Sequence, residues 1–241
     1  MSTAMRDLPE DRPENIGYDL VGMGSFFIDP SGAARRVHTK WFWVGPLILF
    51  SMLAMIASYF IMPLVQHVLE TAPIPAGTDP DRYQRALEMG MTFQRIAMYF
   101  APVTTAAIYL IQTLALFVMS TILTVEAKFR QIFNLVAGCS LISMLATIAS
   151  LIILKAKGEV STMAELRPAL GLDIFLPDGS NKYLVALLGY FSIFEIWWIV
   201  MLVLTFSAAF RVSKGKAVTI AVPLILLSLC FRLLLALRQP A

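Results

Sequence analysis

One acidic residue lies deep inside an apolar segment, and it is the side chain best placed to do chemistry. Glu195 follows Tyr183 by 12 residues in an apolar stretch that runs to residue 210. In a continuous helix its carboxyl group would lie about 18 Å from the outer end of the stretch, near the middle of a membrane. A carboxylate there must be protonated, hydrogen-bonded or next to water. Gln112, near the middle of another apolar stretch, is the expected partner.

Two interpretations of Glu195 are open. It is either a proton or substrate site of a transporter, or one half of a neutral Glu–Gln hydrogen bond that locks helices together. Transporters usually combine several ionisable groups with interrupted helices at the midplane. The sequence shows no second acid at this depth and no Gly/Pro-interrupted half-helices, which favours the structural role. Arg232, offset by roughly 10 Å along the axis, is expected to point outward instead of pairing with Glu195.

Small and hydroxyl-bearing residues recur at helical spacing in the same stretches. This pattern is typical of faces on which membrane helices pack closely. The predicted packing residues are Cys139, Ser143, Thr147 and Ser150 in one stretch, and Gly189 and Ser192, on the face of Glu195, in another.

Patterns for enzymatic chemistry are missing from the sequence. It contains no H-E-x-x-H, G-x-S-x-G, phosphate-binding glycine loop or C-x-x-C. His38 and His67 are isolated, and Cys139 and Cys230 both lie in apolar runs. We therefore expect neither an enzyme nor a metal or other cofactor.

A basic segment precedes the first apolar stretch. Asp29 is a suitable N-cap, and Pro30 suits the first helical position because no amide hydrogen is needed there. Residues 21–40 are thus predicted to form an interfacial amphipathic helix whose basic side chains, Arg35, Arg36 and Lys40, contact lipid headgroups. Its apolar side chains, predicted to face lipid, are Phe26, Phe27, Ala33, Ala34 and Val37.

The elements that carry these residues are predicted to be membrane-spanning helices. Hydrophobic residues make up 58% of the chain and charged residues 15%, against roughly 45–50% and 25% in soluble domains. The fold class is therefore all-α, a polytopic transmembrane helix bundle of about five spans with a short juxtamembrane amphipathic helix. Within a transmembrane domain at residues 41–241, the spans are predicted at about 41–65, 96–125, 132–154, 183–210 and 217–237.

The segments outside the spans give the expected orientation. Residues 1–20, polar and without the pattern of a signal peptide, are predicted to be a disordered cytoplasmic tail. Residues 78–81 start a second capped helix that leads into the second span. The short links at 126–131 and 211–216 are basic, and basic links favour the cytoplasmic side. We expect the N-terminus inside and the C-terminus outside.

Four segments together resemble the Yip (Ypt/Rab-interacting protein) family. They are Phe27, Asp29, Pro30 and residues 33–36 before the first span, and residues 128–137, 191–198 and 212–217. The resemblance, which covers residues 24–237, implies a non-enzymatic five-span protein with a cytoplasmic N-terminus. Its bacterial members suggest the bacterial inner membrane. Eukaryotic relatives bind small GTPases in vesicle trafficking, a role that the resemblance to bacterial members does not carry over.

Three functions are compatible with these features. The first is a membrane scaffold or accessory subunit that works through lateral helix contacts with itself or another membrane protein. The second is a small transporter or channel that uses Glu195 and Gln112. The third is organisation of lipids by the basic amphipathic helix. The expected partners are the lipid bilayer and a membrane protein or a second copy of the chain, and not nucleic acid.

Overall fold

Helices make up most of the structure. The computed structural model describes residues 20–72, 77, 79–163, 165–177 and 179–237, so the predicted tail, except Leu20, lies outside the described residues. These residues contain no β-strand. The elements in chain order are α1 (Leu20–Ile28), α2 (Pro30–Val37), α3 (Val44–Thr71), α4 (Pro80–Tyr99), α5 (Ala101–Ile122), α6 (Phe129–Lys157), the short 3-10 helix η1 (Leu172–Phe175), α7 (Lys182–Tyr190), α8 (Ile193–Phe210) and α9 (Lys214–Leu237).

Five of these helices are long and apolar enough to cross a membrane. They are α3, α5, α6, α8 and α9, and a helix needs about 20 apolar residues to span a hydrocarbon core of about 30 Å. The predicted all-α bundle of five transmembrane helices is therefore confirmed.

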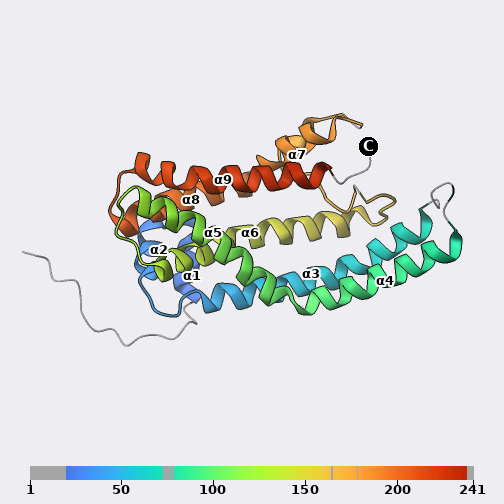
Figure 1. Ribbon diagram of the computed structural model, residues 1–241, viewed down its shortest axis with the longest axis horizontal. Helices are drawn as coiled ribbons and strands as arrows, with labels where there is room; N and C mark the ends of the chain where they lie inside the picture. Colours follow the sequence, from blue (N-terminus) through green and yellow to red (C-terminus); the bar gives the residue numbers. More distant parts are fainter. Residues whose placement is uncertain (1–19, 73–76, 78, 164, 178, 238–241) are drawn as a thin grey trace, which may run out of the picture.

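Helix α6 lies at the centre of the bundle. It contacts α3, α5 and α8 as well as α1 and α2, and Figure 1 shows the long helices arranged along it. Residues 134–142 of α6 are all buried. Close packing here requires a small residue, because a Cβ atom on Gly138 would overlap the ring of Phe26.

Helices α1 and α2 pack into the bundle instead of lying on its surface. The predicted cap is present: the Asp29 side chain accepts a hydrogen bond from the Ser31 amide at 3.1 Å, and Pro30 opens α2. The prediction that the apolar side chains face lipid was wrong for four of the five. Phe27 is partly buried against the core, while the other four are buried against α6 and α8: Phe26, Ala33, Ala34 and Val37. The reason is that an apolar side chain is satisfied equally by lipid and by protein, and the sequence pattern does not distinguish them.

Helices α3 and α4 form a hairpin that reaches beyond the end of α9 (Figure 1). Helix α4 begins at its predicted cap, where the Asp79 side chain accepts a hydrogen bond from the Asp81 amide at 3.1 Å. None of its 20 residues is buried. The predicted second span thus divides at Phe100 into the exposed helix α4 and the apolar helix α5.

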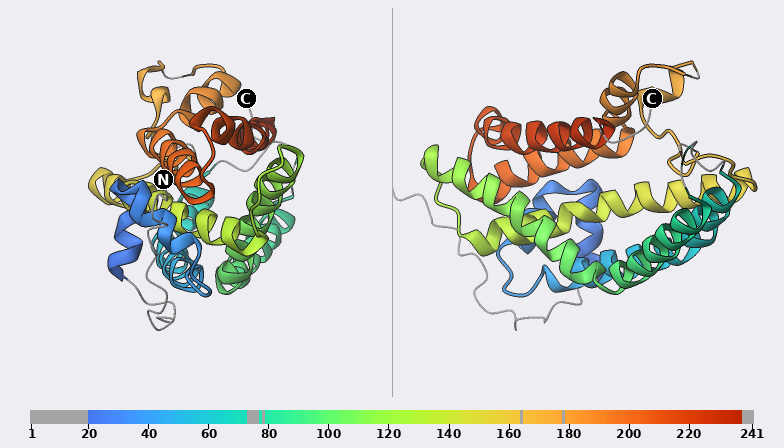
Figure 2. Two further views of the ribbon diagram at one scale, coloured as in Figure 1. Left: turned by 90° about the vertical axis from the view of Figure 1, so that its left-hand side faces the viewer. Right: turned by 45° about the vertical axis from the view of Figure 1, so that its right-hand side comes forward.

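The predicted fourth span is also two helices. Helix α7 ends at Tyr190 and α8 begins at Ile193, and Figure 2 (right) shows α7 leaving in a different direction from α8. Gly171 forms an isolated antiparallel bridge with Ser192 at the break. Glu195 therefore lies in the first turn of α8, not in the middle of a long helix.

Candidate functional site

The helix break next to Glu195 has a local chemical cause. The Ser192 hydroxyl accepts a hydrogen bond from the Glu195 amide at 3.1 Å, which caps the first turn of α8. Serine three residues before glutamate is the pattern of a capping box, and it commonly marks a helix start. The signal was present in the sequence, but it lies inside an apolar run that is long enough to be read as one span.

Glu195 pairs with Arg232 and not with Gln112. The Arg232 Nη2 atom lies 3.7 Å from the Glu195 Oε2 atom. Gln112 is half-buried on α5 and forms no hydrogen bond to any described residue. The expectation that Gln112 is the partner was wrong, and Arg232, although exposed as expected, pairs with Glu195.

The depths of the two charged groups explain why they meet. Glu195 precedes Arg211, at the other end of α8, by 16 residues, or about 24 Å. Arg232 follows Lys214, at the same end of the bundle, by 18 residues, or about 27 Å. Both therefore lie near one edge of a hydrocarbon core of about 30 Å. The prediction of a midplane acid failed because it counted α7 as part of the same helix.

Arg232 also holds the end of α7. Its Nη1 atom donates a hydrogen bond to the Gly189 carbonyl oxygen at 3.0 Å. Its guanidinium lies over the Tyr190 ring, 5.2 Å from the ring centroid. The last carbonyls of a helix have no partner within the helix. Arg232 of α9 therefore supplies a hydrogen-bond donor to the end of α7 and a positive charge to Glu195 of α8. We call Tyr190, Glu195 and Arg232 the outer cluster.

Two glycines beside the outer cluster allow a loop to pack closely against it. A Cβ atom on Gly189 would lie 3.0 Å from an Asp173 carboxylate oxygen, and one on Gly171 would lie 2.9 Å from the Gly189 carbonyl oxygen. Gly189 thus permits close approach of η1 and of the chain before it. Gly189 and Ser192 do not form one face of a continuous helix, because the break separates them.

A second polar group, which sequence reasoning missed, lies inside the bundle. Asn134 of α6 is fully buried. Its Nδ2 atom donates to the carbonyl oxygens of Val37 at 3.0 Å and Thr39 at 2.5 Å, and its Oδ1 atom accepts from the Trp43 amide at 3.1 Å. A single asparagine within an apolar span was the available signal, since buried polar groups need partners. Asn134 fixes the chain between α2 and α3 to the central helix.

Trp197 and Trp198 act inside the protein. The Trp197 indole nitrogen donates to the Phe27 carbonyl oxygen at 2.8 Å, which ties α8 to the end of α1. Trp198 is buried. Both side chains therefore pack or hydrogen-bond within the protein instead of forming a belt at the membrane interface.

The predicted packing stripe of α6 is only partly in the core. Cys139 is fully buried, whereas Ser143, Thr147 and Ser150 are half-buried. The Thr147 and Ser150 hydroxyls donate to carbonyl oxygens of α6 itself, at 3.2 Å and 2.9 Å. The outer part of this stripe therefore stays a predicted contact surface.

The basic residues that were predicted to contact headgroups lie near the links between spans. Arg35 and Lys40 are exposed and Arg36 is half-buried. His38, between them, contacts the start of α6 through Gln131 and the end of α8 through Ala209. We call this end of the bundle, with the links 123–128 and 211–213, the basic end.

Reactive groups are sparse in the part of the chain that the structure describes. No three histidine, cysteine, aspartate or glutamate side chains come together there in a way that could hold a metal ion. The carboxylate of the outer cluster already has a cationic partner. The geometry is that of a cross-link between helices, because Asn134, Trp197 and Arg232 each bond to a group on another element.

Comparison with known proteins identifies one family. Residues 23–235 match the family model of the Yip1 domain, so the match covers most of the chain. No curated protein and no solved structure matches at a significant level.

Proposed function

The chain belongs to the Yip1 domain family, and we propose that it is a non-enzymatic scaffold or accessory subunit of a membrane complex. In this proposal it binds another membrane protein, or a second copy of itself, through lateral helix contacts. The basic end faces the cytoplasm, with the N-terminus inside and the C-terminus outside, in a bacterial inner membrane.

The observation that carries this proposal is the uncovered helix α4. Three large side chains of α4 are strongly exposed: Met89 by 74%, Phe93 by 73% and Tyr99 by 69%. The helix does not qualify as a membrane span, and exposed apolar groups outside a membrane commonly mark a binding surface. A partner that covers α4 would remove this apolar surface from water.

The internal use of polar side chains supports the same proposal. Asn134, Trp197 and Arg232 all donate hydrogen bonds to backbone carbonyls of other elements. These contacts consume groups that could otherwise bind a solute along a pathway through the bundle. Such hydrogen bonds between helices suit a rigid scaffold protein.

Co-purification from native membranes tests the proposal. The tagged chain, solubilised in mild detergent, is expected to retain a specific membrane protein or a second copy of itself. The double variant Met89→Gln/Phe93→Gln should lose it, whereas Arg85→Ala/Glu88→Ala, two exposed polar positions on the same helix, should keep it. If both double variants retain the partner equally well, a role for the apolar face of α4 is contradicted.

The break between α7 and α8 favours a second function, a small transporter or channel. Transporter sites often lie where a helix is interrupted beside a charged group, and Glu195 and Arg232 flank such a break. Proteoliposomes with Glu195→Gln should then lose a proton- or solute-dependent flux. Flux that is equal in the variant and the parent protein would exclude this function.

A further inference from the structure

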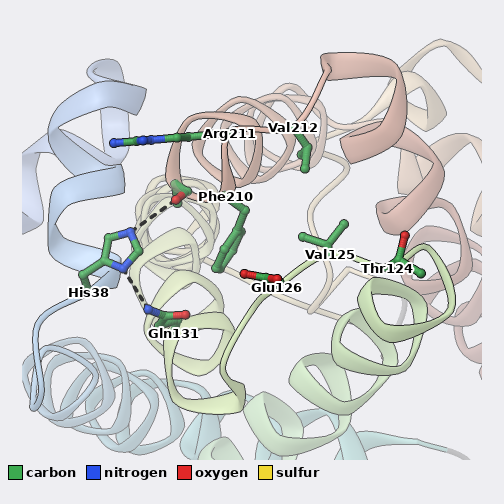
Figure 3. A pocket seen from close by; sticks show the side chains of 9 residues that line it. His38, Thr124, Val125, Glu126, Gln131, Phe210, Arg211 and Val212 are labelled. Atoms are coloured by element: carbon green, nitrogen blue, oxygen red, sulfur yellow. Dashed lines mark hydrogen bonds between the residues drawn. The ribbon is translucent and has the colours of Figure 1, made fainter. Parts of the chain in front are cut away.

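A cavity of about 410 Å³ opens at the basic end. It lies where the α5–α6 link, the end of α8 and the residue after α2 meet (Figure 3). It is a wide-mouthed depression and not an enclosed cavity, which suits a group that enters from the membrane surface. The residues that line it are His38, Thr124, Val125, Glu126, Gln131, Ala209, Phe210, Arg211 and Val212.

The wall formed by His38 is fixed by hydrogen bonds at both ring nitrogens (Figure 3). Gln131 uses its Oε1 atom to accept from the Lys128 amide at 2.9 Å, so its Nε2 amide group faces His38 Nδ1 at 2.8 Å. His38 Nε2 lies 3.2 Å from the Ala209 carbonyl oxygen. In this arrangement Nδ1 accepts from Gln131, and the Nε2 hydrogen is donated to the Ala209 carbonyl oxygen. Because both ring nitrogens have protein partners, His38 links α6 to α8 and leaves no nitrogen available to a metal ion.

Two helices end at the same cavity. Thr124 and Arg211 each have a φ of 53°, and they are the two non-glycine residues with positive φ in the described part of the chain. Each ends a helix in the left-handed conformation, and the amides of Val125 and Val212 donate to the carbonyl oxygens of Ser120 and Ser207, which is a common pattern at helix C-termini. Both residues line the cavity although they belong to different links.

The lining combines one carboxylate and one guanidinium with an apolar wall. Glu126 and Arg211 are exposed at the cavity, and Phe210 forms part of its wall. In the view of Figure 3, the Arg211 side chain extends from the end of α8 toward the N-terminal helices, and Glu126 lies nearer the middle. Two separated charges of opposite sign match a ligand that carries both an anion and a cation. The basic end lies where the spans leave the hydrocarbon core, which is the level of lipid headgroups.

We propose that this cavity binds the phosphoethanolamine headgroup of a phospholipid. The Arg211 guanidinium binds the phosphate, and the Glu126 carboxylate accepts hydrogen bonds from the primary ammonium. A phosphatidylglycerol headgroup has no cation for Glu126, and the trimethylammonium of phosphatidylcholine has no hydrogen to donate to it. The site does not depend on the scaffold role, because it uses neither α4 nor a protein partner.

Native mass spectrometry of the delipidated full chain in detergent tests this site. Equal concentrations of phosphatidylethanolamine, phosphatidylglycerol and phosphatidylcholine with identical acyl chains are added. We expect phosphatidylethanolamine to bind about tenfold more tightly than phosphatidylcholine, the effect of one additional charged hydrogen bond. The variant Glu126→Gln should lose this preference, and Arg211→Gln should weaken the binding of all three lipids.

Two matched variants keep the test specific. Arg130→Gln removes an exposed cation near the same link but outside the cavity, and Glu159→Gln removes an exposed acid after α6. Both should bind lipids like the parent protein. Glycerophosphoethanolamine should compete with the lipid, whereas inorganic phosphate should compete poorly. Equal competition by phosphate, equal binding of the three lipids, or an unchanged preference in correctly folded Glu126→Gln would overturn the proposal.

Discussion

The Arg232 guanidinium lies 3.7 Å from the Glu195 carboxylate and also donates to the Gly189 carbonyl oxygen at 3.0 Å. One side chain of α9 therefore holds both sides of the break between α7 and α8. The side chain of Glu195 is 22% exposed and that of Arg232 43%, so the pair is partly shielded from its surroundings.

The two members of this pair should contribute unequally to stability. Arg232→Gln loses the ion pair, the bond to Gly189 and the contact with the Tyr190 ring, and we expect a loss of about 1–3 kcal/mol. Glu195→Gln keeps a hydrogen-bonding side chain and should cost less. Thermal unfolding in detergent measures both variants. A larger loss in Glu195→Gln than in Arg232→Gln would mean that the contacts of Arg232 with α7 are unimportant.

Replacement of Asn134 should be among the most damaging single changes in the bundle. Asn134→Leu leaves the Trp43 amide and the Val37 and Thr39 carbonyls without their partner. An unsatisfied buried polar group costs about 1–3 kcal/mol, so the melting temperature should fall clearly. Gln112→Leu is the control, because this half-buried amide has no hydrogen bond to a described residue. Similar losses in the two variants would contradict the role of Asn134.

Gly138 should determine whether α1 stays in the bundle. Gly138→Leu overlaps the fully buried ring of Phe26, so we expect α1 to be displaced. In a background in which the exposed Cys230 is replaced by serine, a cysteine placed at Met23, which is 5% exposed, should then react with a maleimide, whereas it should be protected when Gly138 is present. Phe26→Ala should restore protection. Gly215→Leu is the control, because no atom would lie within 4 Å of a new Cβ, and it should leave the cysteine at position 23 protected. Labelling of this cysteine in the control would indicate that the whole bundle has loosened.

The loop after α6 should make a small contribution to stability that depends on pH. A hydrogen bond with Lys157, at 3.0 Å, holds the pKa of Glu165 below its usual range. A carboxylate with a lowered pKa in the folded state stabilises that state above its unfolded pKa of about 4.3, and the contribution is lost as the pH falls through the folded value. Lys157→Met should therefore lower the melting temperature at pH 7 but not near pH 3. Lys155→Met, at an exposed position, should have no such pH-dependent effect.

The features that were predictable from sequence are those that a short segment determines. The apolar lengths of the five spans specify helices that cross a membrane. Asp29 with Pro30, and Asp79 with Pro80, specify helix starts through caps that need only neighbouring residues. These local signals explain why the class of fold and two of its helix starts were correct.

The features that were missed depend on how distant segments pack. The apolar character of Phe26 did not reveal whether lipid or α6 would cover it. The depth of Glu195 was misjudged because the serine cap at Ser192 lies within an uninterrupted apolar run, so α7 was counted as part of α8. The wrong choice of Gln112 as the partner of Glu195 followed from that error. Arg232 matches the depth of Glu195 only when α8 begins at Ile193.

The most direct test of the proposed scaffold role is site-specific photocrosslinking in native membranes. A benzophenone amino acid replaces Phe93 on α4, and the matched control replaces Leu226, which is 54% exposed on the membrane span α9. We predict that illumination joins position 93 to one defined protein, either a partner or a second copy of the chain, while position 226 gives lipid adducts. Lipid adducts alone at both positions would contradict a protein partner at α4.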